Sequence, residues 1–168
     1  NRGIYCFCIY NNELYAGGNF TTAGGTPCSK IAKWTGSAWQ PLGVGVNNNV
    51  YALAVYGGEL WVGGSFNAAG GNQSYNLAKW NGITWTAMGT NTTGPVRSFL
   101  VFNNELYAGG AFTSVQGVPA SSIAKWNGSA WTALGTGMNS VVLTQKVYNG
   151  EVYAAGQFTT AGGNPANY

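Results

Sequence analysis

The sequence predicts an all-β fold, a β-propeller of four-stranded antiparallel blades. Three observations favour it: a repeat of constant length, short apolar runs broken by Asn, Gly and Thr, and 27 glycines among 168 residues. A period of about 40 to 50 residues is typical of one propeller blade. A parallel β-helix would need shorter coils, and a single up-and-down barrel would not explain so regular a period.

The repeat is 46 residues long and continues without insertion or deletion. All four acidic residues of the chain are glutamates that follow this period: Glu13, Glu59, Glu105 and Glu151. Other series keep the same step, namely Phe20, Phe66, Phe112 and Phe158; Lys33-Trp34, Lys79-Trp80 and Lys125-Trp126; Trp39, Trp85 and Trp131; Gly43, Gly89 and Gly135. The period divides one domain, residues 1–168, into blades at 1–46, 47–92 and 93–138 and a partial fourth blade at 139–168.

Each repeat predicts four strands. In the second repeat, residues 50–56 form the first strand and Glu59 begins the next. The pairs between these strands tolerate the positive φ that both central positions of a two-residue hairpin require: Asn11-Asn12, Gly57-Gly58, Asn103-Asn104 and Asn149-Gly150. A glycine pair closes the second strand, and a turn such as Thr35-Gly36 joins the third strand to the fourth, around Trp39. Four short strands cannot bury both faces of a sheet, so the sheets are expected to stack.

The order of these features resembles the kelch and galactose-oxidase family of propeller repeats. Leu14-Tyr15-Ala16-Gly17-Gly18 is similar to that family's double-glycine strand, and Trp34 and Trp39 stand where its aromatic pair is expected. Kelch repeats usually place Tyr at the first of these two positions. The likeness is closer still to the 46-residue repeats of secreted bacterial and fungal cell-surface proteins. The resemblance implies the fold strongly and the function weakly, because propellers host many unrelated functions.

The fourth repeat lacks the residues of its third and fourth strands. Two interpretations follow. In the first, the sequence is a segment of a longer propeller or chain. In the second, a neighbouring molecule completes the ring or stacks on the open blade, because unpaired strand edges invite pairing with another chain. We favour the first, since kelch-like propellers usually have more than four blades.

The residue types needed for several kinds of chemistry are missing. The sequence has no His and no Asp, which excludes a Ser-His-Asp triad, two-His metal sites and Asp-rich calcium loops. We therefore expect a non-enzymatic protein with no catalytic residue, metal site or cofactor. The glutamates are expected to pair with a backbone amide or with the Lys33, Lys79 and Lys125 series. The basic residues do not cluster, which argues against nucleic acid, and no apolar run approaches the roughly 20 residues of a membrane span.

Cysteine and tryptophan are mainly expected inside the fold. Cys6, Cys8 and Cys28 are an odd number, which argues against a disulfide scaffold, and we expect them as small buried side chains. The repeated tryptophans are expected to pack between blades. Trp61 falls outside those series and is a candidate ring for stacking against a sugar.

The loops that follow the second strands are the expected binding surface, because loops vary on a fixed framework. They cover residues 18–29, 64–75 and 110–121. Candidate contact residues are Asn19, Thr21, Thr22, Trp61, Asn67, Asn72, Thr113 and Gln116. Asn-x-Ser/Thr sequons add candidate glycosylation sites at Asn19, Asn72, Asn91 and Asn127.

These observations favour an extracellular or cell-surface propeller that acts as an interaction or structural module. Its partner would be a protein or a glycan, engaged by several equivalent loops at once. One alternative is a self-assembling surface fibre subunit that a neighbouring chain completes. The other is a glycan-binding lectin propeller.

Overall fold

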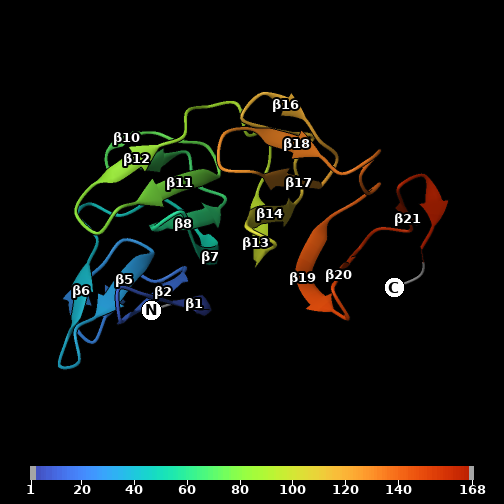
Figure 1. The fold of residues 1–168 in the computed structure, drawn as a ribbon. Coiled ribbons are helices and arrows are strands. Elements are labelled where there is room, and N and C mark those ends of the chain that lie inside the picture. Colours follow the sequence, from blue (N-terminus) through green and yellow to red (C-terminus); the bar gives the residue numbers. More distant parts are fainter. Residues whose placement is uncertain (1–2, 167–168) are drawn as a thin grey trace. The chain divides into compact units, whose positions relative to one another are not determined.

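The computed structural model describes residues 3–166, and every regular element within that range is a β-strand. Asn1 and Tyr168, the limits of the expected domain, lie outside the described residues. No helix in the described part is long and apolar enough to cross a membrane. The chain divides into two compact units, one ending at Thr90 and the other beginning at Asn91. Figure 1 labels the strands.

The first unit holds two four-stranded antiparallel sheets, in the orders β1-β2-β5-β6 and β12-β11-β8-β7. Their strands are β1 (Ile4–Tyr10), β2 (Glu13–Gly18), β5 (Ile31–Trp34), β6 (Trp39–Pro41), β7 (Val50–Tyr56), β8 (Glu59–Gly64), β11 (Leu77–Trp80) and β12 (Trp85–Ala87). Each sheet is therefore built from one repeat. The predicted strands and turns are confirmed here: Asn11 and Asn12, between β1 and β2, have φ of 50° and 60°.

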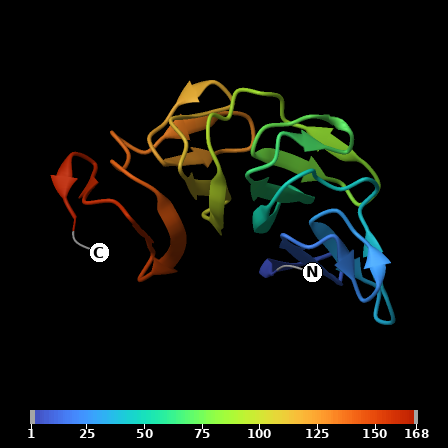
Figure 2. The ribbon, with the colours of Figure 1, turned by 180° about the vertical axis from the view of Figure 1, so that it is seen from behind.

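The second unit repeats this pattern once in full and once in part. Its four-stranded sheet has the order β13-β14-β17-β18, and a two-stranded sheet joins β19 to β20. The strands are β13 (Val96–Phe102), β14 (Glu105–Gly110), β17 (Ile123–Trp126), β18 (Trp131–Ala133), β19 (Val142–Tyr148) and β20 (Glu151–Gly156). Strands β13 and β19 pack side by side, as the views from the front and from behind both show (Figures 1 and 2).

Each segment expected as a loop after the second strand contains a small hairpin instead. The four hairpins are β3 (Thr22–Ala23) with β4 (Thr26–Pro27), β9 (Ala68–Ala69) with β10 (Asn72–Gln73), β15 (Ser114–Val115) with β16 (Val118–Pro119), and β21 (Thr160–Ala161) with β22 (Asn164–Pro165). The turn of the first is Gly24-Gly25, with φ of 54° and 85°. Because its strands have only two residues each, no apolar alternation marked them in the sequence.

The glycine pair at the end of β2 allows backbones to approach closely. A Cβ atom on Gly17 would overlap the side chains of Val50 and Cys6, and one on Gly18 would overlap the backbone of Gly3. The neighbouring sheet and the start of β1 therefore both require glycine here. This agrees with the sequence interpretation of these pairs as points of close strand contact.

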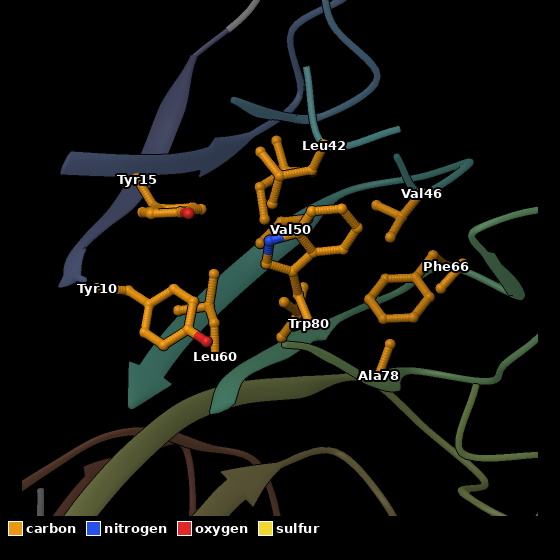
Figure 3. Close-up of a cluster of buried hydrophobic side chains, with 12 residues drawn as sticks. Tyr10, Tyr15, Leu42, Val46, Val50, Leu60, Phe66, Ala78 and Trp80 are labelled. Atoms are coloured by element: carbon orange, nitrogen blue, oxygen red, sulfur yellow. The ribbon is translucent and has the colours of Figure 1, made fainter. Parts of the chain in front are cut away.

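The main core of the first unit lies between its two sheets. Tyr10 and Tyr15 from the β1–β2 hairpin are 3% and 1% exposed, and their rings meet at 5.6 Å (Figure 3). They belong to the same buried cluster as Leu60 and Trp80 of the next sheet. The Tyr10 hydroxyl donates a hydrogen bond of 3.0 Å to the carbonyl of Gly58. Aromatic side chains from the first repeat thus pack against the second repeat, as expected for stacked sheets.

Candidate functional site

The small hairpins of the second, third and fourth repeats are fixed by a side chain from the segment before the first strand of the same repeat. In the first unit, Asn47 Oδ1 accepts hydrogen bonds from the backbone N–H groups of Asn67 and Ala68, at 3.0 and 3.1 Å. Asn47 Nδ2 donates to Asn67 Oδ1 at 2.5 Å. We call this arrangement the hairpin clamp. It holds the loop rigidly while leaving its tip at the surface.

The clamp recurs twice in the second unit. Thr93 Oγ1 accepts from the backbone N–H groups of Thr113 and Ser114, both at 3.0 Å. Asn139 Oδ1 accepts from those of Thr159 and Thr160, at 2.9 and 3.0 Å. The three clamp residues are one repeat apart, so the sequence contained this signal, although we did not identify it.

The candidate contact residues of the first repeat lie on the loop that runs from β2 into β3. Asn19 is half-buried, and its Oδ1 accepts a hydrogen bond of 3.3 Å from the Lys30 amine. Thr21 is exposed and Thr22 is half-buried at the start of β3. The structure therefore brings these three residues together on one loop, with Thr21 the most accessible.

The other candidate contact residues differ in their roles. Asn67 and Thr113 are exposed, but both are engaged by their clamps. Asn72 is exposed on β10. Gln116 is half-buried at a φ of 50° in the turn between β15 and β16, where the equivalent residues of the other hairpins are glycines.

Trp61 is not the accessible ring that the sequence suggested. It is 2% exposed, and its indole Nε1 donates a hydrogen bond of 3.2 Å to the carbonyl of Tyr56. The Lys79 amine lies 5.5 Å from the centre of its ring. The expectation of a sugar-stacking Trp61 is wrong in this structure, because Trp61 takes the inward position of Tyr15 and Tyr107, which are also buried.

The four sequon asparagines occupy different environments. Asn72, Asn91 and Asn127 are exposed, whereas Asn19 is half-buried. The hydroxyl of Ser74, in the sequon of Asn72, is buried and donates to the Leu77 carbonyl at 2.6 Å. Asn127 Oδ1 accepts from the backbone N–H groups of Ser129 and Ala130, both at 2.9 Å, so this side chain shapes its own turn. Use of the sequons stays a prediction.

The repeated glutamates form ion pairs with lysines of the third strands, as predicted. The Nζ–Oε distances are 2.9 Å for Lys33–Glu13, 2.5 Å for Lys79–Glu59 and 2.9 Å for Lys125–Glu105. The hydrogen bond from Lys125 is the main reason that the pKa of Glu105 lies below its ordinary value. The same bond raises the pKa of Lys125. The glutamate of each of these three repeats thus forms a cross-strand ion pair with the lysine of its own repeat.

The thiols lie against the core. Cys28 is buried, Cys6 and Cys8 are half-buried, and all three are free of disulfides. Burial is the main cause that raises the pKa of Cys6 to about 12, and it also raises the pKa of Cys8 and of Cys28. The thiolate form that binds metals or attacks electrophiles is therefore disfavoured. Within residues 3–166, no three His, Cys, Asp or Glu side chains are grouped where they could hold a metal ion.

The repeated tryptophans pack in pairs. The ring centres of Trp34–Trp39, Trp80–Trp85 and Trp126–Trp131 are 5.3 to 5.6 Å apart. Trp80 and Trp131 are buried, and the other four are half-buried. The Trp85 Nε1 donates a hydrogen bond of 2.7 Å to the carbonyl of Leu42, which lies on the segment arriving from the preceding repeat. Trp80 and Trp85 are therefore structural contacts between the first and second repeats.

The most accessible apolar surface of the first unit is on β1, which sequence reasoning had not identified as a site. Ile4, Tyr5, Phe7 and Ile9 are 49%, 50%, 57% and 70% exposed. We call these residues the β1 apolar row. Of the equivalent residues of β7, Val50 is buried in the first unit's core and Leu53 and Val55 pack against it, so residue type alone could not reveal the exposed row. Tyr51 stacks on Tyr5, with ring centres 5.7 Å apart.

Two grooves lie on the first sheet. One, of about 180 Å³, is lined by Ile4, Ala16, Phe20, Thr22, Ala23, Gly24 and Trp39. The other, of about 400 Å³, is lined by Ile9, Asn12, Glu13, Leu14, Trp34, Thr35 and Gly36. We call them the hairpin groove and the tryptophan groove. Both are lined by a mixture of apolar and polar residues, with a tryptophan in each.

Comparison with known proteins identifies the fold family. No curated protein matches the chain. A family model does match it, the one described as the Rax2 C-terminal beta propeller domain, over residues 7–147. With its antiparallel four-stranded sheets, one to each complete repeat, the chain belongs to the Rax2 C-terminal beta propeller domain family.

Proposed function

We propose that this β-propeller is a non-enzymatic interaction or structural module of the cell surface or extracellular space. The observation that carries the proposal is the β1 apolar row. Monomeric soluble proteins rarely expose a contiguous row of large apolar side chains unless it meets a partner. The polar hairpins would form the rim around such a contact. Several equivalent hairpins could also add weak contacts together.

A photo-cross-linking experiment tests this interaction surface. A benzoylphenylalanine in place of Phe7 should cross-link the protein to a partner protein when irradiated in its native cells. The same residue in place of Ile83, which is 82% exposed on the turn between β11 and β12, is the matched control. Cross-linking at position 7 but not at position 83 supports the proposal. Equal yields, or none at position 7, would refute it.

The extracellular location rests on sequence features. The chain is only 7% charged, carries four sequons and resembles kelch-like and secreted cell-surface repeats. A membrane-impermeant biotin reagent should therefore label the native protein on intact cells. Labelling that requires cell lysis would count against this location and leave the interaction surface to be judged by the cross-linking.

A second candidate, self-assembly, is favoured by one specific observation. Tyr148 and Tyr153 of the second unit are 64% and 51% exposed, with ring centres 5.9 Å apart. They are the repeat equivalents of the buried pair Tyr10–Tyr15, whose rings are 5.6 Å apart. In the first unit that pair packs against the equivalents of the tryptophan groove, Leu60 and Trp80. One copy could therefore seat its exposed tyrosines in the tryptophan groove of the next.

Sedimentation velocity distinguishes the two candidates. A head-to-tail contact between copies uses two different surfaces, so it predicts species that grow with concentration. Tyr148→Ser should reduce this growth, while Ile83→Ser should leave it unchanged. A uniform monomer at all concentrations would eliminate self-assembly. The glycan-binding alternative has no comparable support, since Trp61 is buried.

A further inference from the structure

We propose that the hairpin groove is a socket for an extended segment of the sequence Leu-Gly-Xaa-Gly-(Val or Met)-Asn, supplied by another repeat of this class. The inference deepens the proposed interaction function by naming the partner's chemistry, and it rests on that function. The groove, of about 180 Å³, is lined among others by Phe20, Ala23, Gly24 and Trp39. Equivalent positions elsewhere in the chain show what fills it.

The first case is the second sheet of the same unit. Leu42 and Val46, from the segment after β6, are 1% and 2% exposed and share a buried cluster with Phe66 and Ala69 (Figure 3). Trp85 packs against this cluster and donates its indole hydrogen to the Leu42 carbonyl at 2.7 Å. Phe66, Ala69 and Trp85 are the repeat equivalents of Phe20, Ala23 and Trp39.

Backbone hydrogen bonds fix the same segment along the hairpin. The Gly70 N–H donates to the Gly45 carbonyl at 3.0 Å, and the Asn47 N–H donates to the Ala68 carbonyl at 3.3 Å. Val46 and Ala69 form an antiparallel bridge. The clamp of Asn47 then closes the contact. The segment is held as a short additional strand, a common mode of peptide recognition.

The second case lies in the other unit. Leu134 and Met138 pack against the buried Phe158 in a cluster that also includes Ala161. The Gly162 N–H donates to the Gly137 carbonyl at 2.8 Å, and Met138 bridges to Ala161. The sequences concerned are Leu-Gly-Val-Gly-Val-Asn at 42–47 and Leu-Gly-Thr-Gly-Met-Asn at 134–139. Two copies of one sequence motif therefore make the same apolar and backbone contacts with a hairpin.

The first sheet presents the same set of receptor groups. Gly24 corresponds to the donors Gly70 and Gly162, and it has the same left-handed conformation, with φ of 54° against 59° for both. Trp39 corresponds to Trp85 and lines the groove. The socket would therefore hold the leucine side chain in an apolar pocket and donate the Trp39 indole hydrogen to the leucine carbonyl. The Gly24 N–H would donate to the carbonyl of the second glycine.

The glycines of the ligand follow from its conformation. Gly43 and Gly45 have φ of 56° and 69°, a region that other residues rarely adopt. Replacing either glycine with Ala would favour chain conformations that cannot lie along the hairpin. The ligand motif is thus defined by a buried leucine, two left-handed glycines, an aliphatic residue and a clamping asparagine.

A synthetic peptide tests the socket. The probe is the fluorescein-labelled octapeptide of residues 40–47, Gln-Pro-Leu-Gly-Val-Gly-Val-Asn, titrated with the whole protein and followed by fluorescence anisotropy. We expect saturable binding. Trp39→Phe should weaken it about tenfold, the effect of losing one buried hydrogen bond. The matched control is Trp85→Phe, because that indole's groove is already filled by the chain's own Leu42.

Peptide variants keep the test valid even if a protein variant folds poorly. Replacing the peptide's leucine with serine, or both glycines with alanine, should abolish measurable binding to the wild-type protein. The proposal fails if the octapeptide does not bind at millimolar concentration. It fails also if the serine peptide binds equally well, or if Trp39→Phe and Trp85→Phe weaken binding alike. If the octapeptide does not bind but the protein still cross-links at position 7, the socket proposal is wrong and the proposed interaction function is unaffected.

Discussion

Removing the clamp of the second repeat should loosen one hairpin by a predictable amount. Asn47→Ala deletes an acceptor of two backbone hydrogen bonds, from Asn67 and Ala68. Each such bond contributes about 0.5 to 1.5 kcal/mol. Asn47 is exposed, so water can replace part of this interaction, and we expect a loss of about 1 to 2 kcal/mol in unfolding free energy. Urea denaturation gives the total, and hydrogen exchange at the Asn67 and Ala68 amides shows where it arises.

The chain itself supplies the control. Thr93 performs the same task in the second unit with a hydroxyl at 3.0 Å from both donors. Asn47→Thr should therefore keep most of the stability that Asn47→Ala loses, and it should keep the two amides protected. If both variants lose equally, or if Asn47→Ala exchanges at wild-type rates, the clamp does not hold the hairpin.

Three further predictions concern the core, the thiols and the ion pairs. Leu60 is 0% exposed, so Leu60→Ala should lower the free energy of unfolding by about 2 to 5 kcal/mol. Leu143 is 43% exposed, so Leu143→Ala should lower it by less than about 1 kcal/mol; urea denaturation measures both. The pKa of Cys6 is raised from 9.0 to about 12, so Cys6 in the folded protein should react with iodoacetamide at pH 8 about fifty-fold more slowly than in denaturant. The smaller thiolate fraction outweighs the greater nucleophilicity of each thiolate. Mass spectrometry of the alkylated peptides measures the two rates, and equal rates would contradict the prediction. Lys125 lowers the pKa of Glu105, so the stability from this pair is present above the carboxyl's ordinary pKa and is lost as the pH falls through the lowered value. The difference in Tm between wild type and Glu105→Gln should therefore shrink on acidification, and a constant difference from pH 7 to pH 2 would contradict the assignment.

The fold followed from the repeat because each of its signals is local. Asn11-Asn12 needs only its own turn, and Gly17-Gly18 only its nearest backbone neighbours, so both could be interpreted without coordinates. The small hairpins were missed because two-residue strands carry no periodicity. The bulge between Ile4 and Cys6, where the register shifts, also left no mark, since its neighbours are ordinary strand residues.

The candidate site was harder to predict because exposure depends on what packs against a residue. Trp61 differs from Tyr15 in type but shares its inward position, so its rarity in the repeat did not indicate a surface role. Ile9 and Val55 are similar side chains at equivalent positions, yet Ile9 is 70% exposed while Val55 packs against the core. Only coordinates distinguish them. The ion pairs could be predicted because both partners recur at one spacing.

Identical residues at equivalent positions make framework contacts in every repeat where their partners are present, so function should be sought where that equivalence is broken. It breaks in two ways. A contact seen in one repeat can be missing among the described residues of another, as at Trp39, which lines the hairpin groove, whereas its equivalent Trp85 donates to the carbonyl of Leu42. A residue can also depart from the shared type, as at Gln116, which takes a φ of 50° where the other hairpins have glycine. A left-handed residue other than glycine costs about 1 to 2 kcal/mol, and such strain persists only where the surrounding structure holds it, often at functional sites. The missing contact at Trp39 defines a surface that fits a known type of segment. The unusual residue at Gln116 indicates a position that is retained at a cost to stability. The socket is the stronger inference, because the chain itself contains two examples of the complex that it would form.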